Sequence, residues 1–460
     1  MHHRYIGDRA FYRRILGIAL PIIIQNGITN FVALLDNIMV GQIGTMPMSA
    51  VSIVNQLIFV FNLCIFGASS GAGIFTAQFH GSQDHDGIRY TFRFKVIVCA
   101  LLTLGSTVLF LLFGSSLIRL YLQGDGSIQD VELVLTCGQD YMAVMLWGLL
   151  PFALSNAYAS TMRETGETVV PMLGGVLAVF VNLVLNYVLI FGHFGAPALG
   201  VQGAALATVI SRVVELLFVG GWVHLKKSRH LFIQGAYRSL HIPGSLLKTI
   251  IVKGMPLLLN EFLWASGLAV IAQCYSTCGL EVVPATNIAS TFCNLGSVVH
   301  MSMGNAVGIL MGQMLGAGHT KEEVWDSNRK LVVLAVFCGL VFGGAMAALS
   351  GIFPNLYNTT APVRQLATKL ICVSALIMPF HSYTNAAYFT LRSGGQTFIT
   401  FLFDSCFVWA FCVPLAFILS HYVRLPILPM FILVQGSEIL KSGVGAYALS
   451  RKKWIQNLTL

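Results

Sequence analysis

The chain has 460 residues, of which 56% are hydrophobic and only 10% are charged, and its mean hydropathy is +0.77. Soluble domains carry about 25% charged residues, so this composition excludes an ordinary soluble protein and indicates a polytopic membrane protein. The net charge is +9, but the basic residues are spread over many connecting segments, which argues against a nucleic-acid partner. The ten cysteines form no CxxC pair, so we expect neither a zinc site nor a disulfide framework.

Long apolar stretches alternate with segments that contain Gly, Pro and charge, and about 20 apolar residues suffice to cross a bilayer. The N-terminus lacks the ordered regions of a cleaved signal peptide, so the first stretch is expected to remain as a helix. The predicted spans are 15–40, 49–77, 94–114, 131–156, 169–191, 200–224, 247–272, 284–313, 331–353, 364–390, 397–420 and 427–449. The predicted fold class is therefore all-α, with twelve transmembrane helices.

The longest polar connector, residues 226–247, lies near the middle of the chain. It predicts an inter-lobe linker between an N-lobe at 1–225 and a C-lobe at 248–460, with six helices each. If the N-terminus is cytoplasmic, 20 of the 27 Lys and Arg residues fall on the inner side and 4 on the outer side. This asymmetry predicts a multi-pass protein of the inner (plasma) membrane with both termini and the linker in the cytoplasm.

The second half of the sequence repeats features of the first half. At an offset of 235 residues the matches are Pro21 with Pro256, Gly44 with Gly279, Gly73 with Gly308, Gln78 with Gln313, and Gly81 with Gly316. At an offset of 229 they are Asn156 with Asn385, Arg163 with Arg392, Gly166 with Gly395, and Thr168 with Thr397. Both offsets cover six helices, so the halves should share one orientation about an axis along the membrane normal. Internal repeats of this kind are typical of secondary transporters, with the substrate path between the halves.

Asp36 is the only Asp, Glu, Lys or Arg between Arg14 and Asp84, and it lies within the first predicted span. A carboxylate there costs a few kcal/mol to insert, and such groups usually face a cavity or a partner. Pro21 precedes it by fifteen residues, leaves one helix carbonyl unpaired and permits a bend. An acid that titrates and a bend on one helix suggest a coupled conformational switch.

Several ordered motifs identify a family resemblance that covers about residues 14–450. They are Leu20-Pro21, Asp36, Val40-Gly41-xx-Gly44, Gly71-x-Gly73, Ala77-Gln78 and Gly81, with Gly254-Met-Pro256, Gly304, Gly308, Gln313 and Leu315-Gly316-Ala in the second half. Met162-Arg163-xx-Gly166-x-Thr168 and Leu391-Arg392-Ser-Gly-Gly395 add a further pair. The chain resembles the multidrug and toxic compound extrusion (MATE) transporters. The resemblance implies two six-helix lobes around a V-shaped cleft. It also implies a monomer in the lipid bilayer that exports cationic or amphipathic small molecules, driven by inward flow of protons or sodium.

The resemblance also implies a cation-coupling site in the N-lobe. Asp36 matches the family's acid on the first helix, and Pro21 matches the proline whose bending follows the state of that acid. Asn182 and Asn186 match a polar pair on the fifth helix, and residues at i and i+4 share a helix face. Their amide oxygens suit a sodium ion and can equally accept a hydrogen bond from a protonated carboxyl group. The coupling ion is therefore H+ or Na+, with no other cofactor expected, and interhelical packing is the alternative role of the two asparagines.

The C-lobe offers further candidates for cation or substrate binding. These are Asn260, Glu261 and Trp264 on the seventh helix, His381, Tyr383 and Asn385 on the tenth, and Asp404 on the eleventh. Other intramembrane charges are interpreted as self-neutralising pairs three residues apart, Arg212 with Glu215 and Glu438 with Lys441.

The leading hypothesis is a secondary active multidrug exporter that works by alternating access, in which cation binding at Asp36 bends the first helix and expels the drug. The alternatives are a lipid-linked precursor flippase or a dedicated metabolite exporter of the same superfamily. A flippase would favour extra helices and a strongly cationic cavity, which this sequence lacks. No Walker lysine motif or clustered catalytic signature is present, so the sequence predicts no enzyme and no drive by ATP.

Overall fold

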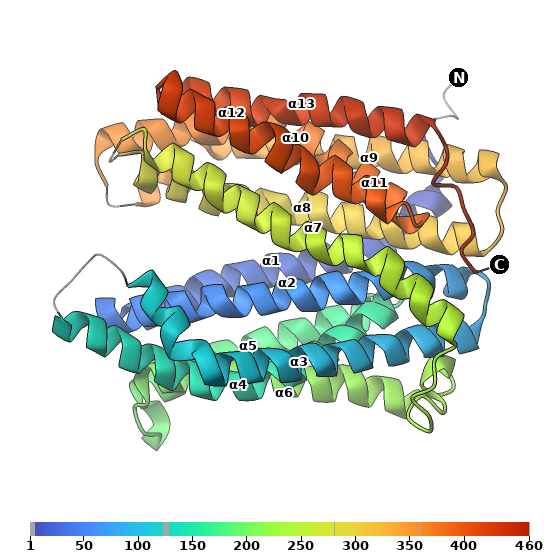
Figure 1. Ribbon diagram of the computed structural model, residues 1–460, viewed down its shortest axis with the longest axis horizontal. Coiled ribbons are helices and arrows are strands. Elements are labelled where there is room, and N and C mark those ends of the chain that lie inside the picture. Colours follow the sequence, from blue (N-terminus) through green and yellow to red (C-terminus); the bar gives the residue numbers. More distant parts are fainter. Residues whose placement is uncertain (1–4, 123–127, 280, 358, 460) are drawn as a thin grey trace. The chain divides into compact units, whose positions relative to one another are not determined.

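The computed structural model describes residues 5–122, 128–279, 281–357 and 359–459 (Figure 1). Within these ranges, twelve helices are long and apolar enough to cross a membrane. They are α1 Arg9–Gly41, α2 Thr45–Gly81, α3 His85–Tyr121, α4 Ile128–Glu164, α5 Val169–Phe191, α6 Gly200–Leu225, α7 Gly244–Ser276, α8 Val282–Gly316, α9 Lys321–Leu349, α10 Ala361–Ser393, the eleventh span Thr397–Tyr422, and α13 Ile427–Ser450. The predicted fold class is confirmed, because every predicted span overlaps one of these helices.

Most helices extend beyond the predicted spans, because their polar first and last turns lie outside the apolar window that marks a span. The clearest case is α9, which begins at Lys321, ten residues before the predicted start. Thr320 caps this helix: its hydroxyl accepts from the Glu323 amide, while the Glu323 carboxylate accepts from the Thr320 amide. The helix also ends early, at Leu349, and a separate short turn follows at Phe353–Leu356.

The eleventh span is wound more loosely than the others. It consists of α11 Thr397–Phe401 and α12 Val413–Phe417, with π-helical turns at Leu402–Cys406, Val408–Cys412 and Ile418–Tyr422. Such turns are rare and occur frequently at functional sites. The first of them carries Asp404, one of the candidate residues predicted from the sequence.

The helices form two compact units, one with residues 24–76 and 85–250, the other with residues 1–23, 77–84 and 251–460. In the first unit, α3 packs on α4, and α6 packs on both α4 and α5. In the second unit, α10 is central and packs against α8, α9 and α13. Helices α1, α2 and α7 each run from one unit into the other. The predicted lobes 1–225 and 248–460 stay a prediction.

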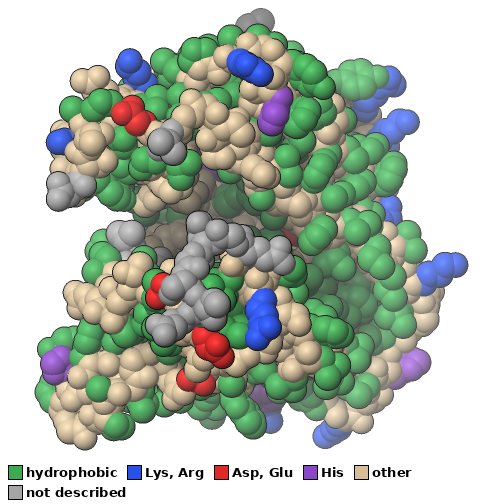
Figure 2. Space-filling model, turned by 60° about the vertical axis from the view of Figure 1, so that its left-hand side comes forward, with side chains coloured by type: hydrophobic (Ala, Val, Ile, Leu, Met, Phe, Trp, Pro, Cys, Tyr) green, Lys and Arg blue, Asp and Glu red, His purple; other side chains and the backbone are tan. Residues whose placement is uncertain are grey.

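Hydrophobic side chains cover much of the surface of the molecule. Figure 2 shows them over most of one face, with acidic and basic side chains few and scattered. Large apolar residues such as Leu111, Leu112 and Phe337 are exposed on the outside of their helices. A water-soluble protein rarely exposes such continuous apolar surface, so this surface is suited to acyl chains.

The predicted linker 226–247 is ordered and belongs to the first unit. Arg93 on α3 donates to three of its carbonyls, from Nε to Ala236 at 2.8 Å, from Nη1 to His241 at 2.9 Å and from Nη2 to Gly235 at 2.8 Å. Since one guanidinium satisfies three backbone acceptors, the linker is fixed to the end of α3 and does not act as a loose tether.

His230 is buried in the same linker, with Nε2 3.4 Å from the Glu167 carboxylate. Burial lowers the pKa of His230 and outweighs the opposite effect of Glu167. The pKa of His230 is therefore lower when the linker packs on the first unit than when the linker is detached. Packing of the linker is favoured at neutral pH and weakens as the pH falls below about 6.5. We expect amide exchange of residues 231–238, corrected for its intrinsic pH dependence, to accelerate on acidification. His230→Gln should remove this acceleration, and equal acceleration in the variant would contradict the prediction.

The last residues form a C-terminal strap, which we define as Arg451–Thr459, packed on the second unit. Trp454 is completely buried, and its Nε1 donates to the Leu449 carbonyl at 3.2 Å. The Gln78 side chain accepts from the Leu458 amide at 2.7 Å and donates to the Ser393 carbonyl at 2.8 Å. A Cβ atom at Gly394 would overlap the carbonyl of Trp454, so the strap lies directly against the end of α10.

Trp454→Ala should lower the stability of the protein by roughly 3–5 kcal/mol, because it empties a fully buried indole site. The measurement is the thermal unfolding midpoint of the purified protein in detergent. Trp147→Ala is the matched control, since 79% of the Trp147 side chain is exposed and no comparable cavity would form. Equal midpoints for Trp454→Ala and the control would show that the strap adds little stability.

Two pairs of residues matched by the internal repeat pack against one another in the second unit. A Cβ atom on Gly81 would overlap the Gln313 carbonyl, and a Cβ atom on Gly316 would overlap the Gln78 carbonyl. Only glycine lets the ends of α2 and α8 approach with their backbones in contact. The repeat therefore coincides with reciprocal packing at this crossing.

Candidate functional site

In the first unit, the structure brings Asp36 on α1 together with the two asparagines of α5. Asn186 Nδ2 donates to Asp36 Oδ1 at 2.8 Å. Asn182 fits best with its Nδ2 facing Asp36, at 2.8 Å from Oδ2, and its oxygen then accepts from the Thr208 hydroxyl of α6 at 3.2 Å. The four-residue spacing on α5 places both amides on the face that meets α1.

The charge on Asp36 has no direct counter-charge among the described residues. Arg212 is near enough to act on Asp36 electrostatically, but its guanidinium is bound to Glu215 at 3.2 Å and lies 5.0 Å from the centre of the Phe152 ring. The predicted Arg212–Glu215 pair is therefore confirmed, and it is neutral as a whole. The cluster around Asp36 carries one uncompensated negative charge whenever the carboxyl group is ionised.

One acceptor in this cluster has no hydrogen-bond donor within the described part of the chain. Asn186 is 2% exposed, and its Oδ1 is buried without a partner. The Asp36 carboxylate can carry a proton, and Asn186 Oδ1 is an oxygen of the kind that suits Na+. Thr208 was not foreseen, because a threonine that bonds its own helix at Ala204 is ordinary in membrane helices.

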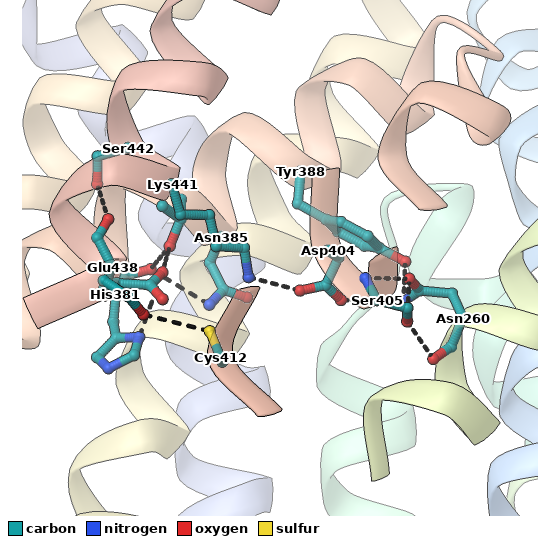
Figure 3. Close-up of polar contacts among 12 residues, drawn as sticks. Asn260, His381, Asn385, Tyr388, Asp404, Ser405, Cys412, Glu438, Lys441 and Ser442 are labelled. Carbon is teal, nitrogen blue, oxygen red and sulfur yellow. Dashed lines mark hydrogen bonds and ion pairs between the residues drawn. The ribbon is translucent and has the colours of Figure 1, made fainter. Parts of the chain in front are cut away.

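In the second unit, the polar candidates lie on a chain of contacts across α7, α10, the eleventh span and α13 (Figure 3). Lys441 Nζ forms an ion pair with Asp404 Oδ1 at 2.6 Å, and Asn260 Nδ2 donates to Asp404 Oδ2 at 3.0 Å. Ser405 donates to the Asn260 side chain at 2.7 Å. Asp404 is thus held in place by a lysine and an amide, so its charge is compensated.

The predicted ion pair of Glu438 with Lys441 does not form, although the two charges act on each other. Lys441 binds Asp404, while Glu438 accepts a hydrogen bond from Thr384 and lies 3.5 Å from His381 Nδ1. The spacing of three residues does put both side chains on one face of α13. Each of them, however, finds a partner on a neighbouring helix, and sequence spacing cannot report such partners.

The remaining candidates differ in their surroundings. His381 stacks on His300 of α8, with ring centres 5.9 Å apart, and the backbone carbonyl of His381 accepts from Asn385 at 3.2 Å. Trp264 packs on the apolar core of the unit, so it lies outside the polar cluster. Tyr383 is half-buried on α10 and makes no hydrogen bond to the cluster among the described residues.

Glu261 follows Asn260 on α7 but does not share its hydrogen bonds. It is half-buried, and the charges that act on it most strongly are those of Arg392 and Asp404. The structure therefore brings together Asn260, Asp404, His381 and Asn385, and places Glu261 beside them. Sequence reasoning did not foresee that His300 and Thr384 join this cluster, because a lone His or Thr in a span is usually a packing residue.

Each unit thus encloses an acidic cluster within an all-helical, membrane-spanning scaffold, which defines a polytopic membrane protein with paired intramembrane charges. The MatE family pattern matches residues 21–188 and 256–420, which is more than half of the chain. The chain belongs to the multidrug and toxic compound extrusion (MATE) family, whose members are transporters and not enzymes.

Curated relatives match over most of their length. The probable multidrug resistance protein NorM of Thermotoga maritima is 24% identical over 461 residues, which cover 97% of this chain and 94% of the relative. The probable multidrug resistance protein YoeA of Bacillus subtilis is 24% identical over 420 residues, which cover 90% and 88%.

Solved structures show the same fold. An outward-facing multidrug resistance MATE family transporter of the MOP superfamily matches with a TM-score of 0.87 at 20% identity, covering 98% of both chains. A MATE structure in the bent conformation matches with a TM-score of 0.85 at 21% identity, covering 98% of this chain and 97% of that chain. A MOP superfamily transporter from Pyrococcus furiosus gives 0.84 at 19% identity, covering 98% of both.

Proposed function

We propose that the chain is a secondary active exporter of cationic or amphipathic drug-like molecules, driven by inward movement of H+ or Na+. The proposal is supported by membership of the MATE family and by two relatives named as multidrug resistance proteins. A coupling role for Asp36 is supported by one observation: this half-buried acid is bound by an amide and not by a base.

The cation would act at Asp36 as follows. When Asp36 is ionised, the amides of Asn186 and Asn182 donate to its oxygens and stabilise the charge. When a proton or a sodium ion is bound, these hydrogen bonds must rearrange, and the contact between α1 and α5 changes with them. Pro21 lies inside α1 and has no amide hydrogen for the helical hydrogen-bond pattern, so it provides a place where the helix can bend in response.

Export requires that the cation and the drug weaken each other's binding, because their coupling free energy is the same in both directions. The cluster around Asp36 is the proposed origin of this coupling.

We also propose that both termini lie on the cytoplasmic side of the membrane. Tyr5 lies 5.9 Å from Arg329 on α9, and Lys452 of the C-terminal strap lies 5.2 Å from the ring of Trp325 on the same helix. Tyr5 and Lys452 thus lie near the same end of α9, which supports an even number of spans.

The test is transport by the full chain in proteoliposomes loaded with a fluorescent cation such as ethidium. We expect an imposed proton gradient or sodium gradient to drive its movement against the direction of the ion, and the effective gradient identifies the ion. The control is the same vesicles with equal ion concentrations on both sides. Movement that is unaffected by either gradient would contradict the proposed antiport.

A further inference from the structure

The linker between α6 and α7 carries basic side chains that the proposed transport mechanism does not use. Figure 1 shows this linker beyond the ends of the two helices, and it belongs to the first unit. Helix α6 ends at Leu225 and α7 begins at Gly244, so the linker joins two spans at one surface of the membrane. The exposed basic residues of the linker, which we call the basic linker surface, are Lys226, Lys227, Arg229 and Arg238.

Contacts within the linker bring its two ends together. The Gln234 side chain donates to the Lys227 carbonyl at 3.0 Å, so the chain turns back toward the end of α6. The ring of Tyr237 stacks on the ring of His224 in the last turn of α6, at an interplanar angle of 17°. Arg238 follows Tyr237 and therefore lies beside the same helix end. Because the linker is fixed to α3, as described above, this arrangement is a lasting feature of the surface.

Acids do not balance the positive charge of the basic linker surface. Residues 216–260 contain no Asp or Glu. In the part of the chain that the structure describes, Glu167 is the one acid that forms an ion pair with this surface, at 3.4 Å from Arg229. At the start of α3, by contrast, Arg89 is paired with Asp86 three residues before it. The basic linker surface thus keeps a net positive charge, which favours an anionic partner.

Apolar side chains are exposed directly beside these charges. Leu225 is 86% exposed immediately before Lys226, and Leu240 is 65% exposed two residues after Arg238. A soluble anion or a nucleic acid would satisfy the charges and leave the leucines in water. A phospholipid offers an anionic headgroup and an apolar chain together, so it matches both features.

We propose that the basic linker surface binds the headgroups of anionic phospholipids, with Leu225 and Leu240 against the adjoining acyl chains. Clusters of Lys and Arg next to a membrane span attract anionic lipids electrostatically. The role of such charges in orienting the chain acts during insertion, and it requires neither an ordered linker nor exposed leucines. The proposal does not depend on the exporter function, because it requires only that the linker lies at a membrane surface.

The first test measures lipid affinity. The purified full chain in an uncharged detergent is titrated with phosphatidylglycerol that carries a fluorescent acyl chain, and with phosphatidylcholine labelled in the same way. We expect the wild type to prefer phosphatidylglycerol, and K226Q/K227Q/R238Q to bind it roughly a hundredfold more weakly, since each Lys or Arg contributes about fivefold. Wild-type affinity for phosphatidylglycerol in the triple variant would overturn the proposal.

The matched control is R451Q/K452Q/K453Q in the C-terminal strap, which removes the same number of charges. All three residues are exposed, but Trp454 and Ile455 beside them are buried in the protein and not available to a lipid. The control should keep the wild-type affinity. An equal loss in both triple variants would show that charge alone attracts the lipid and would overturn a site at the linker. Displacement of the lipid by soluble glycerol phosphate at an equal concentration would contradict the part given to the leucines.

The second test locates the lipid and needs no variant. The full chain in phosphatidylcholine nanodiscs receives a small amount of photoactivatable phosphatidylglycerol, and the labelled peptides are mapped after irradiation. We expect label on residues 225–241, and we expect unlabelled phosphatidylglycerol and high salt to suppress it. Label confined to other segments would refute the proposal. Suppression by unlabelled phosphatidylcholine to the same extent would refute it as well, because the site would then not select anionic headgroups.

Discussion

Asp36→Asn should abolish export driven by an ion gradient. The substitution keeps the size of the side chain, and its one acceptor oxygen can still accept from Asn186 or from Asn182. It removes the negative charge of the Asp36 cluster, however, and with it the group that we propose to bind the coupling cation. We expect transport in proteoliposomes to fall to the level of vesicles without protein, while ethidium still binds and its affinity no longer depends on the coupling ion.

The matched control for this prediction is Asp140→Asn on α4. It makes the same chemical change, but Asp140 is exposed and is not part of the cluster. Its transport should equal that of the wild type. Gradient-driven export by Asp36→Asn at wild-type rate would show that the coupling ion binds elsewhere, and the second unit would then be the first place to search.

Lys441→Met should strongly destabilise the second unit. It removes the partner of Asp404 and leaves two buried carboxylates, Asp404 and Glu438, without a permanent positive charge nearby. Removing one member of a buried ion pair typically costs about 3–5 kcal/mol, because the other charge stays desolvated. We expect a large fall in the thermal unfolding midpoint and in the yield of folded protein.

The double variant Lys441→Met with Asp404→Asn tests the charge explanation. It removes one positive and one negative charge together, while Asn260 can still donate to the oxygen of the new amide. Much of the lost stability should return if charge balance is the cause. A double variant as unstable as Lys441→Met alone would show that the lysine acts by packing, since its stem crosses the face of Phe403 with Nζ 5.4 Å from the ring centre.

The sequence contained most of the fold, because apolar length alone locates membrane helices. Both ends of α5 were predicted to the residue, since Thr168 and Gly192 bound its apolar run. The start of α9 was missed by ten residues, because the capping pair of Thr320 and Glu323 lies in polar sequence that a hydropathy argument assigns to a loop.

The sites were predicted unequally for a physical reason. Asp36 is a lone charge in an apolar stretch, and Asn182 and Asn186 are one helical turn apart, so both signals are local and readable in sequence. The partners of Glu438 and Lys441 are on other helices, and the choice among them depends on helix rotation and packing. No spacing rule within α13 could have favoured Asp404 over Glu438 as the partner of the lysine.

The C-terminal strap has a practical consequence for anyone who labels this protein. A fluorescent protein or affinity tag fused to the C-terminal strap would follow directly on a segment that is bound by Gln78. Its bulk would disturb the packing of the buried Trp454 side chain. A small epitope inserted at the turn His193–Gly195 avoids this problem, because Phe194 at its centre is 90% exposed. Reporters placed there should leave the packing around Trp454 undisturbed.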